Sequence, residues 1–303
     1  MSELLNLFTN NILPILLVAS VGFVLQKLLK FDPRPLSQVT FYVLSPALVF
    51  TLLVSAEIEG GRVLSMMAFA ALVVLLTAGL SFGVGRTLGL GGKHVAAFLL
   101  TTTFMNAGNY GLSLNKFAFG DFGLALASIY FVASQMMTHS LGVYIASVGG
   151  SGTLQAFKGL TRVPSVYAIP LALGIRALDI AVPLPISRPI ELLSLATVPT
   201  MLLLLGMQIA RAGVPRYRKS LSASVAIKLL AAPAIAFLIA PLIGLEGLAR
   251  DVGILQSAMP TAVMTTIIAT EYDAEAAFVT GAVLVTTLLS PLTLTPLIGV
   301  LLG

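Results

Sequence analysis

Charged side chains and cysteine are scarce in this chain of 303 residues. Asp, Glu, Lys and Arg together make up 10% of it, against about 25% in a soluble globular domain. The absence of cysteine excludes a small secreted protein held together by disulfides. The two histidines, His94 and His139, lie far apart in the sequence, so no nucleophile with a base and no metal cluster is evident. We therefore expect neither an enzyme nor a bound metal or cofactor.

Most of the residues in the chain are apolar. Hydrophobic residues account for 57% of the chain, and the mean hydropathy is +1.01. The apolar character extends along the whole length, and one crossing of a bilayer takes roughly 20 apolar residues, so about ten crossings fit. This leaves no stretch for a separate soluble catalytic or nucleic-acid-binding domain. The net charge of +5 is instead typical of the cytoplasmic loops of a membrane protein.

Ten apolar segments, separated by Gly, Pro and clusters of charge, predict an all-α integral membrane protein. The first segment is too long for the core of a signal peptide, so we expect it to be retained as a membrane span. The segments are 5–28, 36–55, 63–85, 94–119, 122–148, 163–180, 189–210, 220–243, 248–272 and 276–302.

The distribution of basic residues predicts the orientation. The loops after odd-numbered segments hold eleven Lys and Arg residues, and the opposite loops hold five. Because basic loops stay in the cytoplasm, we expect a cell inner membrane protein with both termini outside. The densest basic cluster, Arg216 to Lys219, is also a candidate for contact with anionic lipid head groups.

The two halves of the chain share landmarks at an offset of 153 residues. Pro46 in the second segment matches Pro199 in the seventh, and the run from Phe119 to Asp121 matches the run from Tyr272 to Ala274. Five segments per half is an odd number, so the second copy begins on the opposite side of the membrane and is inverted. The predicted units are a first five-helix repeat at 1–148, a linker at 149–162 and a second, inverted five-helix repeat at 163–303.

Two segments carry helix-breaking residues at their centres. The fourth contains the run from Met105 to Gly111, with two asparagines and two glycines, and the ninth contains Pro260, which lacks an N–H donor. Pro260 matches Ala107 at the same offset, so the interruptions lie at matching depth and the helices are expected to cross there. Interrupted membrane helices line binding sites, and their N-terminal N–H groups attract anions. The alternative is that Gly, Pro and Asn serve only helix packing here.

These runs resemble the auxin efflux carrier family. The resemblance rests on Asn106 to Gly111 with Phe119-Gly120, and on Met259 to Val263 with Ala269 to Tyr272. It implies ten helices in two inverted repeats, with helices 1, 2, 6 and 7 as scaffold and helices 3, 4, 5, 8, 9 and 10 as a moving domain. Substrate then binds beside crossing helices 4 and 9. Asn106 occupies the substrate-contacting asparagine position of the family, and Pro260 the crossover proline.

The sequence also departs from plant members of that family. Met105 stands where they usually carry a proline, and the central loop is short. Both features indicate a bacterial-type carrier, and the resemblance implies a small organic anion: an indole acid such as auxin, or a dicarboxylate such as malate or malonate. The sequence leaves open whether the carrier forms a homodimer. One alternative is a sodium-coupled symporter of the fold-related bile-acid type, which needs a carboxylate in helix 9, where only Glu271 is available. A non-transporting membrane sensor is another.

The expected substrate-binding residues come from both interruptions and from the fifth segment. Gln135 and His139 lie four residues apart, hence on one helix face, and polar groups at such depth are functional candidates. His139 is the candidate for proton coupling because a histidine changes charge near neutral pH; the alternative is a hydrogen bond to a neighbouring helix. Lys228 is expected to extend its ammonium to the cytoplasmic surface. The predicted site comprises Asn106, Gly108, Asn109, Tyr110, Gln135, His139, Pro260 and Thr261, with Gln208 and Gln256 as further candidates.

Overall fold

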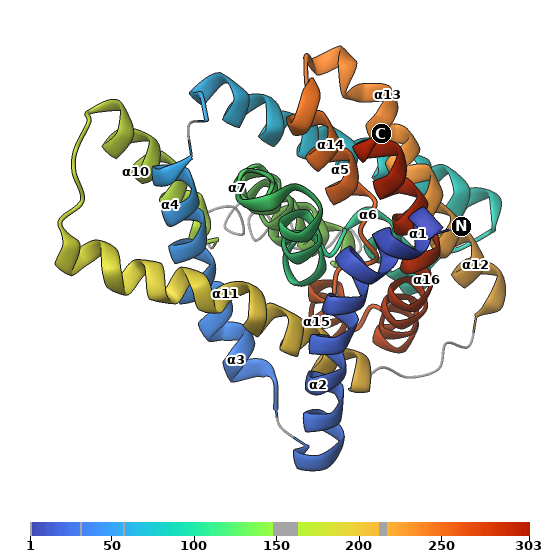
Figure 1. Ribbon diagram of the computed structural model, residues 1–303. Helices are drawn as coiled ribbons and strands as arrows, with labels where there is room; N and C mark the ends of the chain where they lie inside the picture. Colours follow the sequence, from blue (N-terminus) through green and yellow to red (C-terminus); the bar gives the residue numbers. More distant parts are fainter. Residues whose placement is uncertain (1, 31, 57, 148–162, 212–216) are drawn as a thin grey trace.

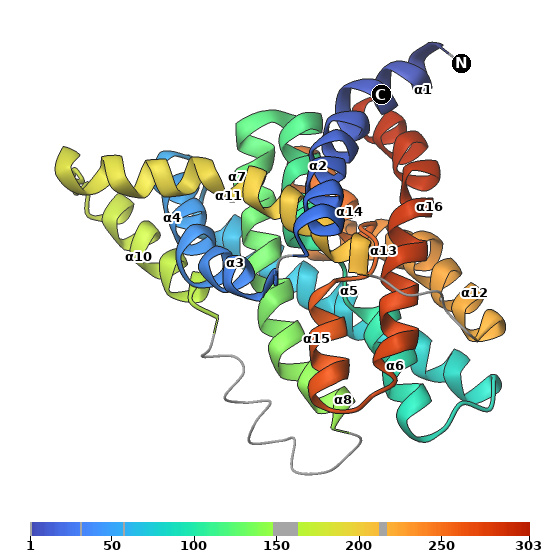
Figure 2. The same cartoon turned by 90° about the horizontal axis from the view of Figure 1, so that it is seen from below.

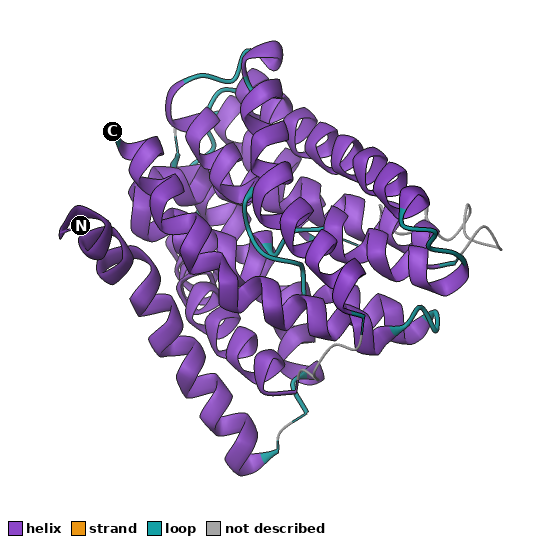
Figure 3. Cartoon of the chain, turned by 90° about the vertical axis from the view of Figure 1, so that its right-hand side faces the viewer, coloured by secondary structure: helices purple, strands orange, loops and turns teal. Residues whose placement is uncertain are grey.

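The computed structural model describes residues 2–30, 32–56, 58–147, 163–211 and 217–303. Within these ranges the chain is helical, with loops between the helices and no β-strand beyond one isolated bridge between Met105 and Thr261 (Figure 3). The expected linker at 149–162 and Arg216 of the basic cluster lie outside the described residues.

Five of the expected segments contain a π-helical turn, so each of these segments holds three or more elements. The first half contains α1 (Ser2–Leu7), η1 (Phe8–Ile12), α2 (Leu13–Leu29), α3 (Arg34–Val39), η2 (Thr40–Leu44), α4 (Ser45–Ser55), α5 (Gly60–Thr87), α6 (Gly92–Thr103), η3 (Ala107–Leu112), α7 (Ser113–Met137), η4 (Thr138–Gly142) and α8 (Val143–Ala146). The second half contains α10 (Ser165–Ala177), α11 (Leu184–Arg211), α12 (Arg218–Ala226), η5 (Ile227–Ala231), α13 (Ala232–Ile239), η6 (Pro241–Ile243), α14 (Gly247–Ser257), α15 (Met264–Glu271) and α16 (Ala276–Leu302).

Seven helices in the described residues are long and apolar enough to cross a membrane, which makes this a multi-pass membrane protein. The structure has seven such helices rather than the ten expected segments because three of the segments differ locally from a single long helix, as follows. The sixth segment forms only the 13 residues of α10, and the ninth is divided between α14 and α15. The latter part of the fourth segment continues into the fifth as one helical stretch of 40 residues, Ala107–Ala146.

A glycine turns the chain inside that long stretch. Gly120 has φ 69° and ψ −158°, a conformation outside the helical region that side chains with a Cβ rarely adopt. The predicted end of the fourth segment at residue 119 therefore coincides with a real change of direction. The matching landmark at the offset of 153 residues also has positive φ, at Asp273 with 51°.

The helices form two groups. In one group, α2 and α4 pack against α11, and α4 packs against α10; in the other, α5, α6, α7 and α12 to α16 pack mainly on one another (Figure 1). Seen after a quarter turn, α4, α10 and α11 lie at one side and α6, α12 and α16 at the other, with α7 between them (Figure 2). The interruptions of the fourth and ninth segments both belong to the second group.

Small residues let α2 and α11 approach closely. A Cβ on Gly206 would lie 1.7 Å from the carbonyl oxygen of Ala19, and one on Gly22 would lie 2.1 Å from that of Leu203. Such contacts between backbones are how membrane helices associate where no hydrophobic driving force acts between them. Elsewhere in α11, the Thr197 hydroxyl donates a hydrogen bond of 2.9 Å to the carbonyl oxygen of Leu44, which ends η2.

The prediction that Lys228 reaches the cytoplasmic surface is wrong. Its side chain lies in η5, in the middle of the apolar helix Arg218–Ile243, and it is 0% exposed. Lys228 lies only nine positions beyond Lys219 in the sequence, which is why its ammonium is expected to reach the surface. In the structure, neighbouring helices enclose the side chain instead. Sequence spacing along one helix does not reveal which face the tertiary packing covers.

Candidate functional site

The site is built on two places where helices stop in the interior. α6 ends at Thr103 and helical structure resumes at Ala107, while α14 ends at Ser257 and α15 begins at Met264. In the first interruption Asn106 has φ −77° and ψ 58°, which is not helical. In the second, Pro260 lacks the N–H that would continue a helix.

The two interruptions satisfy each other's backbone groups. The Asn106 N–H donates to the Pro260 carbonyl oxygen at 2.7 Å, and the Ala262 N–H donates to the Phe104 carbonyl oxygen at 3.0 Å. These bonds form the isolated bridge centred on Met105 and Thr261. Backbone without internal hydrogen bonds is tolerated at membrane depth only where it is buried in protein or lines a cavity, and this pairing meets that need.

Threonine and glutamine side chains stabilise the backbone pairing between the two interruptions through further hydrogen bonds. The Thr261 hydroxyl donates to the Thr101 carbonyl oxygen at 2.7 Å, and the Thr261 N–H donates to Thr286 Oγ1 of α16 at 3.1 Å. Gln256 is fully buried, and its Nε2 donates to the carbonyl oxygens of Ala107 at 3.3 Å and Ala127 at 3.2 Å. Gln256, a further candidate for the site, thus serves to hold α14 against η3 and α7.

A cavity of about 80 Å³ lies beside the first interruption. One wall comes from α3, η2, α4 and α11, and the other from both interruptions, η3, α7 and α15, so the cavity lies between the two helix groups. Among the described residues its lining contains hydroxyls, amides, aromatic rings and aliphatic groups but no charged side chain. The lining residues are Ser37, Thr40, Phe41, Ser45, Met105, Asn106, Ala107, Gly108, Asn109, Phe131, Ser134, Gln135, Met201, Leu204, Gln208, Ala262, Val263, Met264 and Ile267.

Four of the predicted site residues line this cavity. Asn106 is 5% exposed, and its Nδ2 has no hydrogen-bond partner among the described residues. Asn109 donates through Nδ2 to Gln208 Oε1 at 3.2 Å, which ties η3 to α11 across the cavity. Gly108 lies so close to Phe131 that a Cβ would be 2.7 Å from the ring, and Gln135 lines the wall from α7.

The other four predicted residues lie behind or beside the cavity. Tyr110 is fully buried and lies 3.5 Å from Ser290 Oγ of α16, which donates to its hydroxyl. Pro260 and Thr261 contribute to the backbone pairing and its bracing. His139 is bonded through Nδ1 to the Gln135 carbonyl oxygen at 2.9 Å, and its ring stacks on Phe41, a cavity residue, with 5.2 Å between centroids.

Sequence reasoning missed the wall formed by the second segment. Ser37, Thr40, Phe41 and Ser45 line the cavity from α3, η2 and the start of α4. Ser37, Thr40 and Ser45 are spaced three and five residues apart and form a polar stripe, which could have been found by the same reasoning that singled out Gln135 and His139. Ser134 was missed next to Gln135; its hydroxyl donates to Met105 Sδ at 3.4 Å.

The arrangement offers neutral donors to a ligand. Gly108 and Asn109 line the cavity, and their N–H groups lie in the first turn of η3, where no preceding turn supplies a carbonyl partner. They carry positive partial charge, to which the Asn106 amide adds a donor without an internal partner. Within the described part of the chain no group of three or more His, Cys, Asp or Glu residues is placed to hold a metal ion.

Comparison with known proteins identifies relatives along the whole chain. The family model described as membrane transport protein matches residues 7–158 and 151–298. An uncharacterised transporter of Methanothermobacter thermautotrophicus is 26% identical over 290 residues, 93% of this chain and 94% of the relative. An uncharacterised transporter of Methanocaldococcus jannaschii is 25% identical over 277 residues, 84% of this chain and 85% of the relative. The resemblance to the auxin efflux carrier type is thereby confirmed, and the chain belongs to the membrane transport protein family.

Proposed function

We propose that the chain is a secondary transporter that moves a small organic anion across the cell inner membrane by alternating access. The observation that carries this proposal is the cavity between the two helix groups, with the unpartnered Asn106 amide in its wall. A cavity with donors but no charged side chain binds an anion through hydrogen bonds and helix N-termini, and it releases the anion more readily than a salt bridge would.

The helix packing supports a division into a scaffold and a moving domain. The group of α2, α4, α10 and α11 corresponds to helices 1, 2, 6 and 7, and the other group holds both interruptions. Movement of one group against the other would open the cavity to either side in turn. In this proposal η3 and α15 begin at the crossing of helices 4 and 9.

One contact and one shared backbone conformation support the proposed inverted repeat. The Thr197 to Leu44 hydrogen bond joins residues that are 153 positions apart, the offset that relates the two halves in sequence. It therefore connects equivalent positions, as expected close to an axis of pseudo-twofold symmetry. Gly120 and Asp273, also 153 positions apart, both have positive φ at the ends of their interrupted helices.

The size of the cavity favours a dicarboxylate over an indole acid. A volume of about 80 Å³ provides space for roughly six water molecules. Malonate and malate are the smallest of the candidate anions, so they need the least change in this space to bind. The fused ring of an indole acid is larger and would require the two groups to separate. We therefore propose a dicarboxylate of malonate or malate size as the substrate class.

Uptake into proteoliposomes tests the proposal. Purified full-length protein is reconstituted and supplied with radiolabelled malonate, malate or indole-3-acetate, with protein-free liposomes as control. We expect saturable uptake of malonate or malate that excess unlabelled substrate inhibits. Uptake of indole-3-acetate alone would contradict the size argument. Binding without uptake of any of the three would favour a sensor.

A further inference from the structure

A second hollow lies at the other end of α6 from the interruption, and its lining is positively charged. Arg218 and Lys219 of α12 line it together with His94, near the start of α6, whereas no carboxylate of the described residues does. Its volume is about 440 Å³, and it shares no lining residue with the cavity of the proposed transport site. A ligand bound in this hollow would therefore be separate from the transported anion.

The charges of Arg218 and Lys219 are not balanced by acidic neighbours. Two other exposed basic residues, Lys93 and Arg211, each form an ion pair with an aspartate. Within the described part of the chain, neither Arg218 nor Lys219 has such a partner. Both side chains are exposed. Unbalanced positive charge of this kind, gathered beside a hollow, raises the local concentration of anions.

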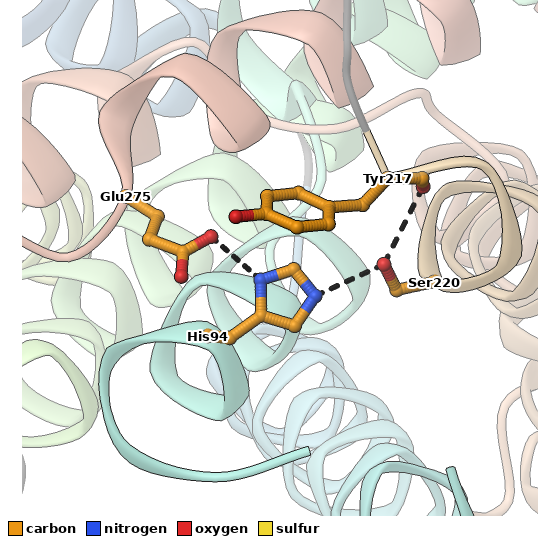
Figure 4. Close-up of polar contacts among 4 residues, drawn as sticks. All are labelled: His94, Tyr217, Ser220 and Glu275. Carbon is orange, nitrogen blue, oxygen red and sulfur yellow. Dashed lines mark hydrogen bonds and ion pairs between the residues drawn. The ribbon is translucent and has the colours of Figure 1, made fainter. Parts of the chain in front are cut away.

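A cluster of side chains holds the starts of α6 and α12 together at the hollow (Figure 4). His94 Nδ1 donates to Glu275 Oε2 at 2.6 Å, because an ionised carboxylate only accepts, and His94 Nε2 lies 3.0 Å from Ser220 Oγ. The rings of Tyr217 and Phe278 pack on the His94 ring, with 4.5 and 4.9 Å between centroids. The Glu275 carboxylate is thereby directed to His94, and the basic pair extends from a helix start that is held in place.

The donors at the hollow fit a phosphate monoester. The guanidinium of Arg218 presents N–H groups in a fork that matches two phosphate oxygens, and Lys219 adds a point charge. A phosphate monoester carries about −1.5 to −2 charge at neutral pH and three strong acceptor oxygens, so it matches two cations better than a single carboxylate does. The first-turn N–H groups of α12, which begins at Arg218, add positive partial charge.

The remaining wall of the hollow is apolar. It is formed by Leu88 and Leu90, in the connection between α5 and α6, and Leu88 is 40% exposed. Apolar side chains beside a phosphate site favour a phosphate that carries acyl chains. The predicted topology places the hollow at the cytoplasmic surface, where lipid head groups and soluble phosphate esters both occur.

We propose that this hollow binds a phosphate monoester, with Arg218 and Lys219 as the residues that contact the phosphate. The cluster around His94 is the support that holds α12 in position against α6. The two leucines favour phosphatidic acid, a phospholipid with a monoester head group, over a soluble ester.

Isothermal titration of the purified full-length protein in nonionic detergent compares three probes. Dihexanoyl phosphatidic acid carries the monoester and two short acyl chains, glycerol 3-phosphate carries the monoester alone, and dihexanoyl phosphatidylcholine carries the acyl chains without net charge. We expect phosphatidic acid to bind most tightly and phosphatidylcholine not to bind. Equal affinity for glycerol 3-phosphate would confirm the phosphate site and assign it to soluble esters. Binding of neither monoester, or equal binding of phosphatidylcholine, would overturn the proposal.

A pair of double variants tests the position of the site. Arg218→Gln combined with Lys219→Gln removes both charges from exposed positions, and we expect the Kd for phosphatidic acid to rise at least about tenfold. Lys27→Gln combined with Arg34→Gln removes the same charge from exposed positions that do not line the hollow, and it should leave the Kd unchanged. Equal weakening by the two pairs would show general attraction between charges and overturn the site. Because uptake of malonate or malate is measured separately, failure of the transport proposal leaves this test intact.

Discussion

The backbone N–H of Asn106 donates a hydrogen bond to the carbonyl oxygen of Pro260 at 2.7 Å, while the side-chain nitrogen of Asn106 has no partner among the described residues. The two predicted site residues are therefore joined through main-chain atoms alone. Because side-chain substitutions leave this bond in place, the effect of the Asn106 amide on ligand binding can be separated from its effect on the fold.

The first prediction concerns Asn106→Ala. It removes a donor that makes no internal hydrogen bond, so the Tm should change little. If the amide donates to a carboxylate of the anion, affinity should fall by about 1 to 3 kcal/mol, which is roughly 5- to 150-fold in Kd. Isothermal titration of purified protein with malonate or malate measures the change.

Asn115→Ala is the matched control for that experiment. Asn115 is also a fully buried asparagine, but its Nδ2 donates to the Gly111 carbonyl oxygen at 2.8 Å and it does not line the cavity. It should lower the Tm and leave Kd unchanged. An Asn106→Ala protein that binds the anion as tightly as wild type would assign Asn106 to helix packing alone.

A second prediction concerns the contact between α2 and α11. In Gly206→Ala the new Cβ would lie 1.7 Å from the Ala19 carbonyl oxygen, and the obstacle is backbone, which no rotamer change relieves. The helices must separate, so we expect a loss of stability of about 1 to 3 kcal/mol or more and a lower Tm by circular dichroism. Gly83→Ala, on the exposed side of α5 with no atom within 4 Å of the Cβ, should be neutral or slightly stabilising. Equal melting of both variants would contradict the close approach.

The sequence revealed the features that depend on local chemistry. The Asn and Gly residues near position 106 and the proline at 260 weaken helical structure locally, so the sequence alone predicts where both helices are interrupted. Features set by packing between distant segments were not accessible. Tyr110 follows Asn109 in sequence, yet one helical step turns it from the cavity toward Ser290. The burial of Lys228 and the cavity wall from Ser37 to Ser45 likewise depend on which helix faces meet.

The third prediction concerns orientation, for which the eleven-to-five distribution of basic residues is the only basis. Because the natural chain has no cysteine, single cysteines can be introduced at two exposed positions, Glu59 and Lys219. A membrane-impermeant maleimide applied to intact cells should label Glu59→Cys and not Lys219→Cys, and both should react once the cells are permeabilised. Labelling of both in intact cells, or of Lys219→Cys alone, would refute the proposed topology.

The last prediction concerns coupling. Sodium prefers oxygen ligands and a tight site usually includes a carboxylate, but no carboxylate of the described part of the chain lines the cavity, so uptake should persist when sodium is replaced by choline. His139 is connected to the cavity through its stacking on Phe41, and protonation would add positive charge beside the anion site. Uptake by wild type should therefore be faster at external pH 5.5 than at pH 7.5, and in His139→Gln this pH dependence should disappear while uptake at pH 7.5 is retained. Strict dependence on sodium would contradict the first expectation and favour a bile-acid-type symporter. An unchanged pH response in His139→Gln would assign His139 to helix packing, to which its contacts with Phe41 and the Gln135 carbonyl oxygen contribute.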